Sequence, residues 1–238
     1  MFEKSLASIG IGSAQVEAKL ERPRYRQGDL VRGKITVTAG EAEEKIDAIY
    51  LHIVTPNVKG KETGCLFTTY QIATSLEVGS NQPAKVIPFE FRLSNDMPVT
   101  LDDYSIYLKV GFESEQAGEL EEEDQIEILP HPLAEHLFTA MDNVGCQLVG
   151  VEYVTGEYFP DLPFAQRFEF QTTGELKKIL QGLSLFYRVD EEGVLEALMR
   201  MHFESGDKEE RMIIKEEELD EDLGNLEQLI IELIIANE

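Results

Sequence analysis

The chain has 238 residues, of which 42% are hydrophobic, so it can fold as one large domain or as two domains of about 100 residues each. Its 46 acidic residues outnumber its 21 basic residues and give a formal net charge of −25 at pH 7. A surface of this charge repels phosphate backbones and anionic lipids, which argues against nucleic acids and membranes as partners.

The first half of the chain has the two-residue periodicity of β-strands. Val16, Ala18 and Leu20 alternate with polar residues, which predicts a strand with one buried face. Gly10-Ile11-Gly12 before it is interpreted as a flexible connection, and a turn bracketed by Pro23 and Gly28 follows it. Further strands are predicted at 30–37, 46–54, 65–78, 85–93, 104–112 and 125–129. Seven strands without intervening helices indicate an antiparallel sandwich.

The second half begins with a proline-containing segment, Pro130-His131-Pro132, which we expect to act as a semi-rigid linker. A short helix is predicted at 134–143, and strands at 146–154, 164–171, 183–189, 197–203 and 211–215 form a second, smaller sandwich. An amphipathic helix, expected to begin near Asp220 or Asp222, ends the chain. The predicted domains are therefore residues 1–130 and residues 131–238.

The two cysteines, Cys65 and Cys146, have neither a CxxC nor a zinc-like spacing, which favours the reducing cytoplasm over a disulfide framework. The first ten residues lack the apolar core of a signal peptide, and the apolar run at 229–235 is broken by Glu232 and too short to span a bilayer. We expect a cytoplasmic protein without a membrane span.

No local motif predicts catalysis, a metal or a cofactor. His131 and His136 are five residues apart across a proline, which points them in different directions on a helix. A thiolate at Cys65 would need a histidine nearby in space, and the sequence leaves His52 and His202 open for that role. The acidic run at 119–124 lacks the spacing of a calcium loop. We expect the protein not to be an enzyme and to have no cofactor.

Positive charge is concentrated at one place on this acidic chain. Five residues around the first hairpin carry it, and together they are called the basic hairpin: Arg22, Arg24, Arg26, Arg32 and Lys34. They could bind an acidic or phosphorylated segment of a partner protein. Alternatively, they pair with the protein's own acidic residues, and the sequence leaves both interpretations open.

The terminal helix offers a second candidate surface. Leu229, Ile231, Ile234 and Ile235 widen its apolar stripe beyond a narrow seam. Of these, Leu229, Ile231 and Ile235 are the candidate partner-binding residues. This helix could pack entirely on its own domain, or an exposed edge could bind a partner protein or a second copy in a homodimer.

Five stretches of the sequence carry a family resemblance: residues 6–14, 25–33 and 45–51, the linker at 129–133, and Leu162-Pro163-Phe164-Ala165-Gln166-Arg167-Phe168-Glu169-Phe170. In this combination they resemble the SpoOM family of bacterial sporulation-control proteins. Gln27 stands where the family usually has proline. The resemblance implies an arrestin-like fold of two tandem β-sandwiches and a part in controlling sporulation or a related cell-state decision.

The predicted function is therefore that of a non-enzymatic adaptor or regulator that binds other proteins at concave faces and open sheet edges. The alternatives are a small-ligand or carbohydrate-binding β-sandwich and a hydrolase with dispersed carboxylates. The absence of tryptophan argues against the first alternative, and the absence of a nucleophile or metal motif argues against the second.

Overall fold

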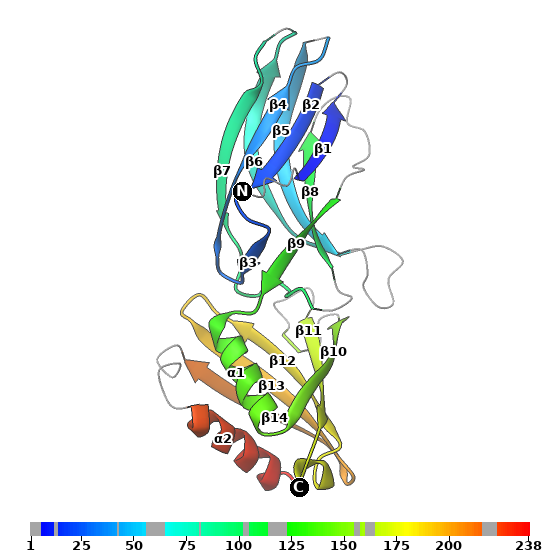
Figure 1. The fold of residues 1–238 in the computed structure, drawn as a ribbon, viewed down its shortest axis with the longest axis vertical. Coiled ribbons are helices and arrows are strands. Elements are labelled where there is room, and N and C mark those ends of the chain that lie inside the picture. Colours follow the sequence, from blue (N-terminus) through cyan, green and yellow to red (C-terminus); the bar gives the residue numbers. More distant parts are fainter. Residues whose placement is uncertain are drawn as a thin grey trace. The chain divides into compact units, whose positions relative to one another are not determined.

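The computed structural model describes residues 6–11, 14–41, 43–55, 65–80, 82–101, 105–113, 123–154, 158–159, 165–215 and 223–238. These residues divide into two compact units. The first ends at Leu129 and the second begins at Pro130. Both units are built mainly of strands, and two α-helices lie in the second unit (Figure 1). Each unit is described by itself.

The first unit contains two sheets. One has the order β1 (Leu6–Ile11), β2 (Ala14–Leu20), β4 (Leu30–Thr38) and β7 (Lys85–Arg92). The other has the order β3 (Arg24–Arg26), β9 (Glu123–Leu129), β8 (Ile106–Glu113), β5 (Glu44–Thr55) and β6 (Cys65–Val78). Alternate residues of both sheets, such as Val31 and Ile35 in β4 and Ile49 and Leu51 in β5, belong to one buried apolar cluster. Burial of one face of each sheet explains the two-residue periodicity in the sequence.

Two predictions for this unit were wrong in detail. Gly10 and Ile11 are not a flexible connection, because they belong to β1 and pair with β2. The predicted turn between β2 and β4 contains the three-residue strand β3, which runs parallel to β9. Its end is fixed by a hydrogen bond from the backbone amide of Gln27 to the carbonyl of Leu129, at 3.0 Å. A proline at position 27 could not donate this bond.

The second unit contains one antiparallel five-stranded sheet. Its order is β10 (Cys146–Val154), β11 (Ala165–Thr172), β12 (Gly182–Val189), β13 (Val194–Phe203) and β14 (Gly206–Lys215). A 3-10 turn, η1 (Leu176–Lys178), lies between β11 and β12. The helices are α1 (Pro132–Asn143) and α2 (Leu223–Ala236).

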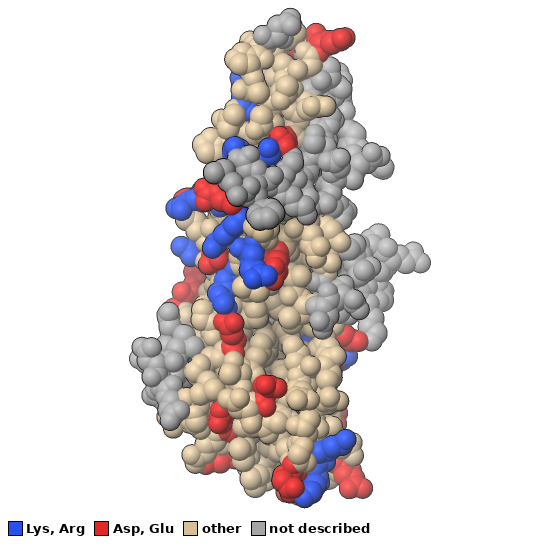
Figure 2. Space-filling view, in the orientation of Figure 1, with Lys and Arg blue, Asp and Glu red and all other residues tan. Residues whose placement is uncertain are grey.

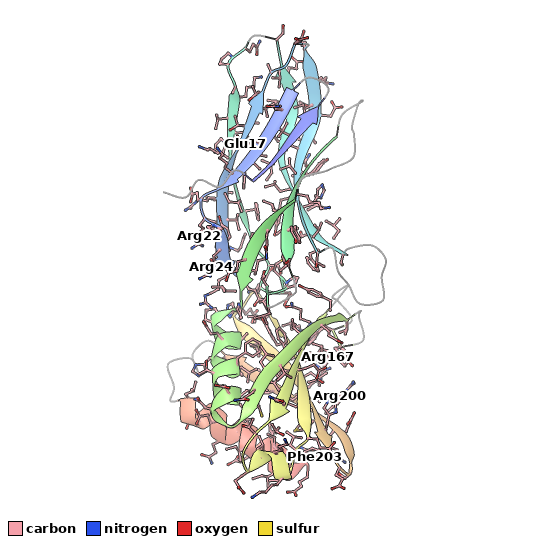
Figure 3. The ribbon with its side chains drawn as sticks, turned by 45° about the vertical axis from the view of Figure 1, so that its right-hand side comes forward. Glu17, Arg22, Arg24, Arg167, Arg200 and Phe203 are labelled. Carbon is pink, nitrogen blue, oxygen red and sulfur yellow. The ribbon has the colours of Figure 1, made fainter. Side chains whose placement is uncertain are left out.

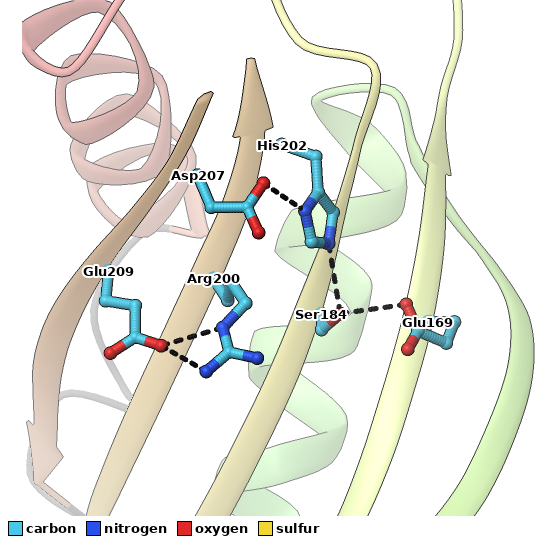
Figure 4. A network of polar contacts seen from close by, with 6 residues as sticks. All are labelled: Glu169, Ser184, Arg200, His202, Asp207 and Glu209. Carbon is cyan, nitrogen blue, oxygen red and sulfur yellow. Dashed lines mark hydrogen bonds and ion pairs between the residues drawn. The ribbon is translucent and has the colours of Figure 1, made fainter. Parts of the chain in front are cut away.

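Helix α1 packs on one face of this sheet, where the ring of Phe138 lies 5.0 Å from that of Phe168 and 5.8 Å from that of Tyr187. The opposite, outer face is seen in Figure 4, where both helices lie behind the sheet. The helix predicted between the two halves, the final helix and the mainly β architecture are confirmed. The expected start of the final helix, at Asp220 or Asp222, lies outside the described residues.

Candidate functional site

Three members of the basic hairpin pair with carboxylates of the same chain. The N–O distances are 2.7 Å for Arg22–Asp29, 2.8 Å for Arg24–Glu127 and 2.8 Å for Arg32–Glu90. The guanidinium of Arg22 also lies 4.6 Å from the centre of the Tyr25 ring. The hydrogen bond to Glu90 is the main reason why the pKa of Arg32 is raised. Figure 2 accordingly shows basic and acidic side chains side by side on this part of the surface.

The basic hairpin is also divided between two sheets. Arg24 and Arg26 lie on β3, whereas Arg32 and Lys34 lie on β4, which belongs to the other sheet. Arg22 and Arg24 lie near each other in Figure 3. The side chains of Arg22, Arg24 and Arg32 are more than half exposed, and solvent screening makes such exposed ion pairs contribute little to stability. An incoming phosphate or carboxylate could therefore replace an internal partner at small cost.

The three apolar residues singled out on the terminal helix are all exposed. Leu229 is 41% exposed, Ile231 40% and Ile235 56%, whereas Ile230 and Ile234 of the same helix are fully buried. Each residue advances about 100° around a helix, so Ile231 and Ile235 share one side and Leu229 lies on nearly the opposite side. The three predicted residues therefore form two separate surfaces, one on each flank of the buried stripe.

A polar contact fixes the position of α2 within its own unit. The side-chain amide of Asn143, the last residue of α1, donates a hydrogen bond of 2.7 Å to Oε1 of Glu227 in α2. With Ile230 and Ile234 buried, this contact leaves the side of Ile231 and Ile235 facing solvent.

Neither cysteine is paired with a histidine among the described contacts. Cys146 is fully buried, and burial raises the pKa of its thiol to about 12, so it stays protonated at neutral pH. Cys65 donates to the carbonyl of Leu66 at 3.8 Å, whereas Nδ1 of His52 lies 2.8 Å from the hydroxyl of Thr69. His202 has other partners, described below. These contacts give no support to a cysteine nucleophile.

A polar network on the outer face of the five-stranded sheet of the second unit was not predicted from the sequence (Figure 4). Nδ1 of His202 lies 2.9 Å from Oδ1 of Asp207, and Nε2 lies 3.3 Å from the hydroxyl of Ser184. The Ser184 hydroxyl donates to Oε2 of Glu169 at 2.9 Å. These residues come from β11, β12, β13 and β14, so only strand pairing brings them together. Sequence spacing carries no signal for such a cross-strand network.

The order Ser184–His202–Asp207 is that of a serine-hydrolase triad, but its bonding differs. A nucleophilic serine gives its proton to the histidine and presents its oxygen to substrate. Here Ser184 is only 3% exposed, and its shorter hydrogen bond goes to Glu169. The network therefore joins four strands through satisfied polar groups and has a structural role.

The histidines of the linker also have local roles. Nδ1 of His131 accepts a hydrogen bond from the backbone amide of Leu133 at 3.3 Å and caps α1. His136 is half-buried on that helix. Within the described ranges no group of three or more His, Cys, Asp or Glu side chains is placed to hold a metal ion. Most of the acidic run at 119–124 lies outside those ranges.

Comparison with known proteins identifies the family. The family model described as SpoOM protein matches residues 2–201. This chain belongs to the SpoOM family. A SpoOM relative, the sporulation-control protein spo0M of Bacillus subtilis (strain 168), is 27% identical over 252 residues, which cover 98% of this chain and 97% of the relative.

The SpoOM fold is shown by a solved structure as well. The crystal structure of Spo0M from Bacillus subtilis matches with a TM-score of 0.81 and 25% identity, over 96% of this chain and all of that chain. A Pseudomonas fluorescens alkylpurine DNA glycosylase, AlkC, reaches a TM-score of only 0.31 at 12% identity, over 46% of this chain and 28% of that one, which carries no argument. No helix among the described residues is both long and apolar enough to cross a membrane.

Proposed function

We propose that this protein is a non-enzymatic, arrestin-like adaptor that binds other proteins in the cytoplasm and takes part in the control of sporulation or a related cell-state decision. The regulatory role is supported by similarity to a sporulation-control protein over almost the whole length of both chains. The mode of action is supported by one feature of α2: two of its isoleucines, Ile231 and Ile235, are exposed to solvent.

The contrast within α2 carries the argument. Ile230 and Ile234 are fully buried, whereas Ile231 and Ile235 are 40% and 56% exposed. Burying a fully exposed isoleucine is worth about 1.5–3 kcal/mol, so two half-exposed ones are a useful binding surface. All charged side chains of residues 223–238 are glutamates, namely Glu227, Glu232 and Glu238. A partner helix with an apolar stripe and basic flanks fits this surface.

The basic hairpin is a second contact for the same adaptor. Its arginines hold carboxylates of the same chain at 2.7–2.8 Å, the geometry in which guanidinium groups bind acidic or phosphorylated peptides. Binding there would exchange one anion for another.

The regulatory role is tested by complementation. A Bacillus subtilis strain lacking its own Spo0M would express this chain, and sporulation frequency would be counted. We expect a shift toward the frequency of the undeleted strain. The double variant Ile231→Glu/Ile235→Glu should not produce this shift. The control Leu66→Glu/Val86→Glu, which changes two exposed apolar residues of the first unit, 55% and 59% exposed, should produce it. Equal behaviour of the two variants would contradict a role for α2.

A further inference from the structure

The six sheet edges of the described strands differ in how well they are protected against pairing with another chain. Exposed strand edges attract other strands, and proteins block them with bulges, prolines, very short strands or charged side chains. Five edges have such a feature. β1 and β10 each contain a register shift, β6 has two shifts in its pairing with β5, β7 contains Pro88, and β3 is three residues long.

The sixth edge, β14, has no bulge and no proline and is ten residues long, so only its charged side chains oppose pairing with another strand. All ten of its residues pair with β13 in an unbroken register, from Val194–Lys215 to Phe203–Gly206, and it contains no proline. On its outer face Ile213 is 52% exposed. Ten regular residues exceed a typical strand length, so this edge can pair with another strand wherever the charges of the two strands are compatible.

Symmetry restricts how two copies of β14 can pair. In an antiparallel pair related by a two-fold axis, the central residue faces its own copy, so a charged central residue meets a like charge. This excludes Lys208, Glu209, Glu210 and Arg211 as centres. With Ile213 at the centre, Arg211 would face Lys215 of the other copy, which is again unfavourable.

Among the described residues of β14, a centre at Met212 brings no two like charges opposite each other. Counting outward from Met212, Arg211 faces Ile213, Glu210 faces Ile214, and Glu209 faces Lys215, each pair occurring twice. Glu209 and Lys215 both lie on the outer face, since β14 residues alternate between the two faces of the sheet. The stem of Arg211 would cover the exposed Ile213.

We propose that two copies of this protein associate through antiparallel pairing of their β14 strands, with Met212 at the two-fold axis. The interface has two Glu209–Lys215 pairs and joins two five-stranded sheets into one of ten strands. It is independent of the adaptor surface on α2, so either proposal can fail alone. The net charge of −25 opposes association, but charges more than about 8 Å apart are largely screened at physiological salt.

The test is sedimentation of the full chain at physiological salt, over about a hundredfold range of concentration. The wild type should show a reversible monomer–dimer equilibrium. Lys215→Glu and Glu209→Lys should each weaken it at least about tenfold, because each places like charges opposite each other twice. An equimolar mixture of the two variants should recover dimers, since the mixed pair restores both opposite-charge contacts.

Two further variants make the result specific. Ile213→Lys should weaken the dimer, because the new lysine faces Arg211 of the other copy. In a register centred on Glu210 the same lysine would face Asp207, and in one centred on Arg211 it would face Glu209. Either of those registers would therefore give a stronger dimer with this variant. Lys178→Glu, an equal charge change on the exposed η1 turn, should leave the equilibrium unchanged. A wild type that stays monomeric at every concentration, or a mixture that fails to recover dimers, would overturn the proposal.

Discussion

Gly111 and His52 should show a strong energetic coupling that can be measured directly. Gly111 lies in β8 and His52 in the neighbouring strand β5. A Cβ added at Gly111 would lie 2.3 Å from Nε2 of His52 and 2.8 Å from its Cδ2, closer than any real Cβ contact. The imidazole must therefore rotate away in Gly111→Ala.

The cost follows from what holds that ring. Rotation breaks the 2.8 Å hydrogen bond to Thr69, worth about 0.5–1.5 kcal/mol, and forces a side-chain torsion off its minimum at a similar cost of about 0.5–1.5 kcal/mol. Replacing glycine by alanine returns about 0.4–1 kcal/mol by restricting the unfolded chain. We expect Gly111→Ala to lower the free energy of unfolding by about 1–2 kcal/mol.

The assay is a double-mutant cycle measured by urea unfolding of the wild type, both single variants and the double variant. In a His52→Ala background the obstacle is gone, so Gly111→Ala should become neutral or stabilising. The coupling energy should be about 2 kcal/mol. Equal effects of Gly111→Ala in both backgrounds would refute the proposed clash.

Three further predictions concern the described side chains. Burial raises the pKa of the Cys146 thiol to about 12, so iodoacetamide at mildly alkaline pH should alkylate Cys65 in the folded protein and Cys146 only after unfolding. Peptide mass spectrometry reads the labelled sites, and rapid labelling of both cysteines in the folded protein would contradict this. Burial, together with the charge of Lys109, lowers the pKa of His52 below 6.5, so the unfolded chain binds more protons than the folded protein. The wild type should therefore lose stability relative to His52→Gln as the pH falls through 6.5. Parallel curves of unfolding free energy against pH for the two proteins would refute this. Chemical unfolding should show a loss of about 2–5 kcal/mol in unfolding free energy for Ile234→Ala, which is buried, and less than about 0.5 kcal/mol for Ile235→Ala, which is exposed. Similar losses for the two variants would mean that α2 packs with another of its sides against the second unit.

Most strands could be predicted from the sequence, because burial of one face of a sheet leaves a two-residue period of apolar side chains. The family resemblance was visible in particular stretches of the sequence. Alternating residues such as Val16 and Ala18 had to lie on a buried face, and Val31 and Ile35 repeated the pattern in the next strand. The short strand β3 had no such signal, because three residues are too few to show a period and it is held by pairing with a strand about a hundred residues away. Gly10 and Ile11 were misjudged because glycine favours turns, whereas here pairing with β2 holds them in a strand.

The candidate surfaces show the same division. The cluster of positive charge at the first hairpin and the wide apolar stripe of the last helix could be read from the sequence, because composition and helical period are local properties. The partners of Arg22, Arg24 and Arg32, the exposed residues of α2 and the contact between Ser184 and His202 could be seen only in the folded chain. These outcomes depend on strand order and register, which join residues that are distant in the chain, and no local pattern encodes that geometry.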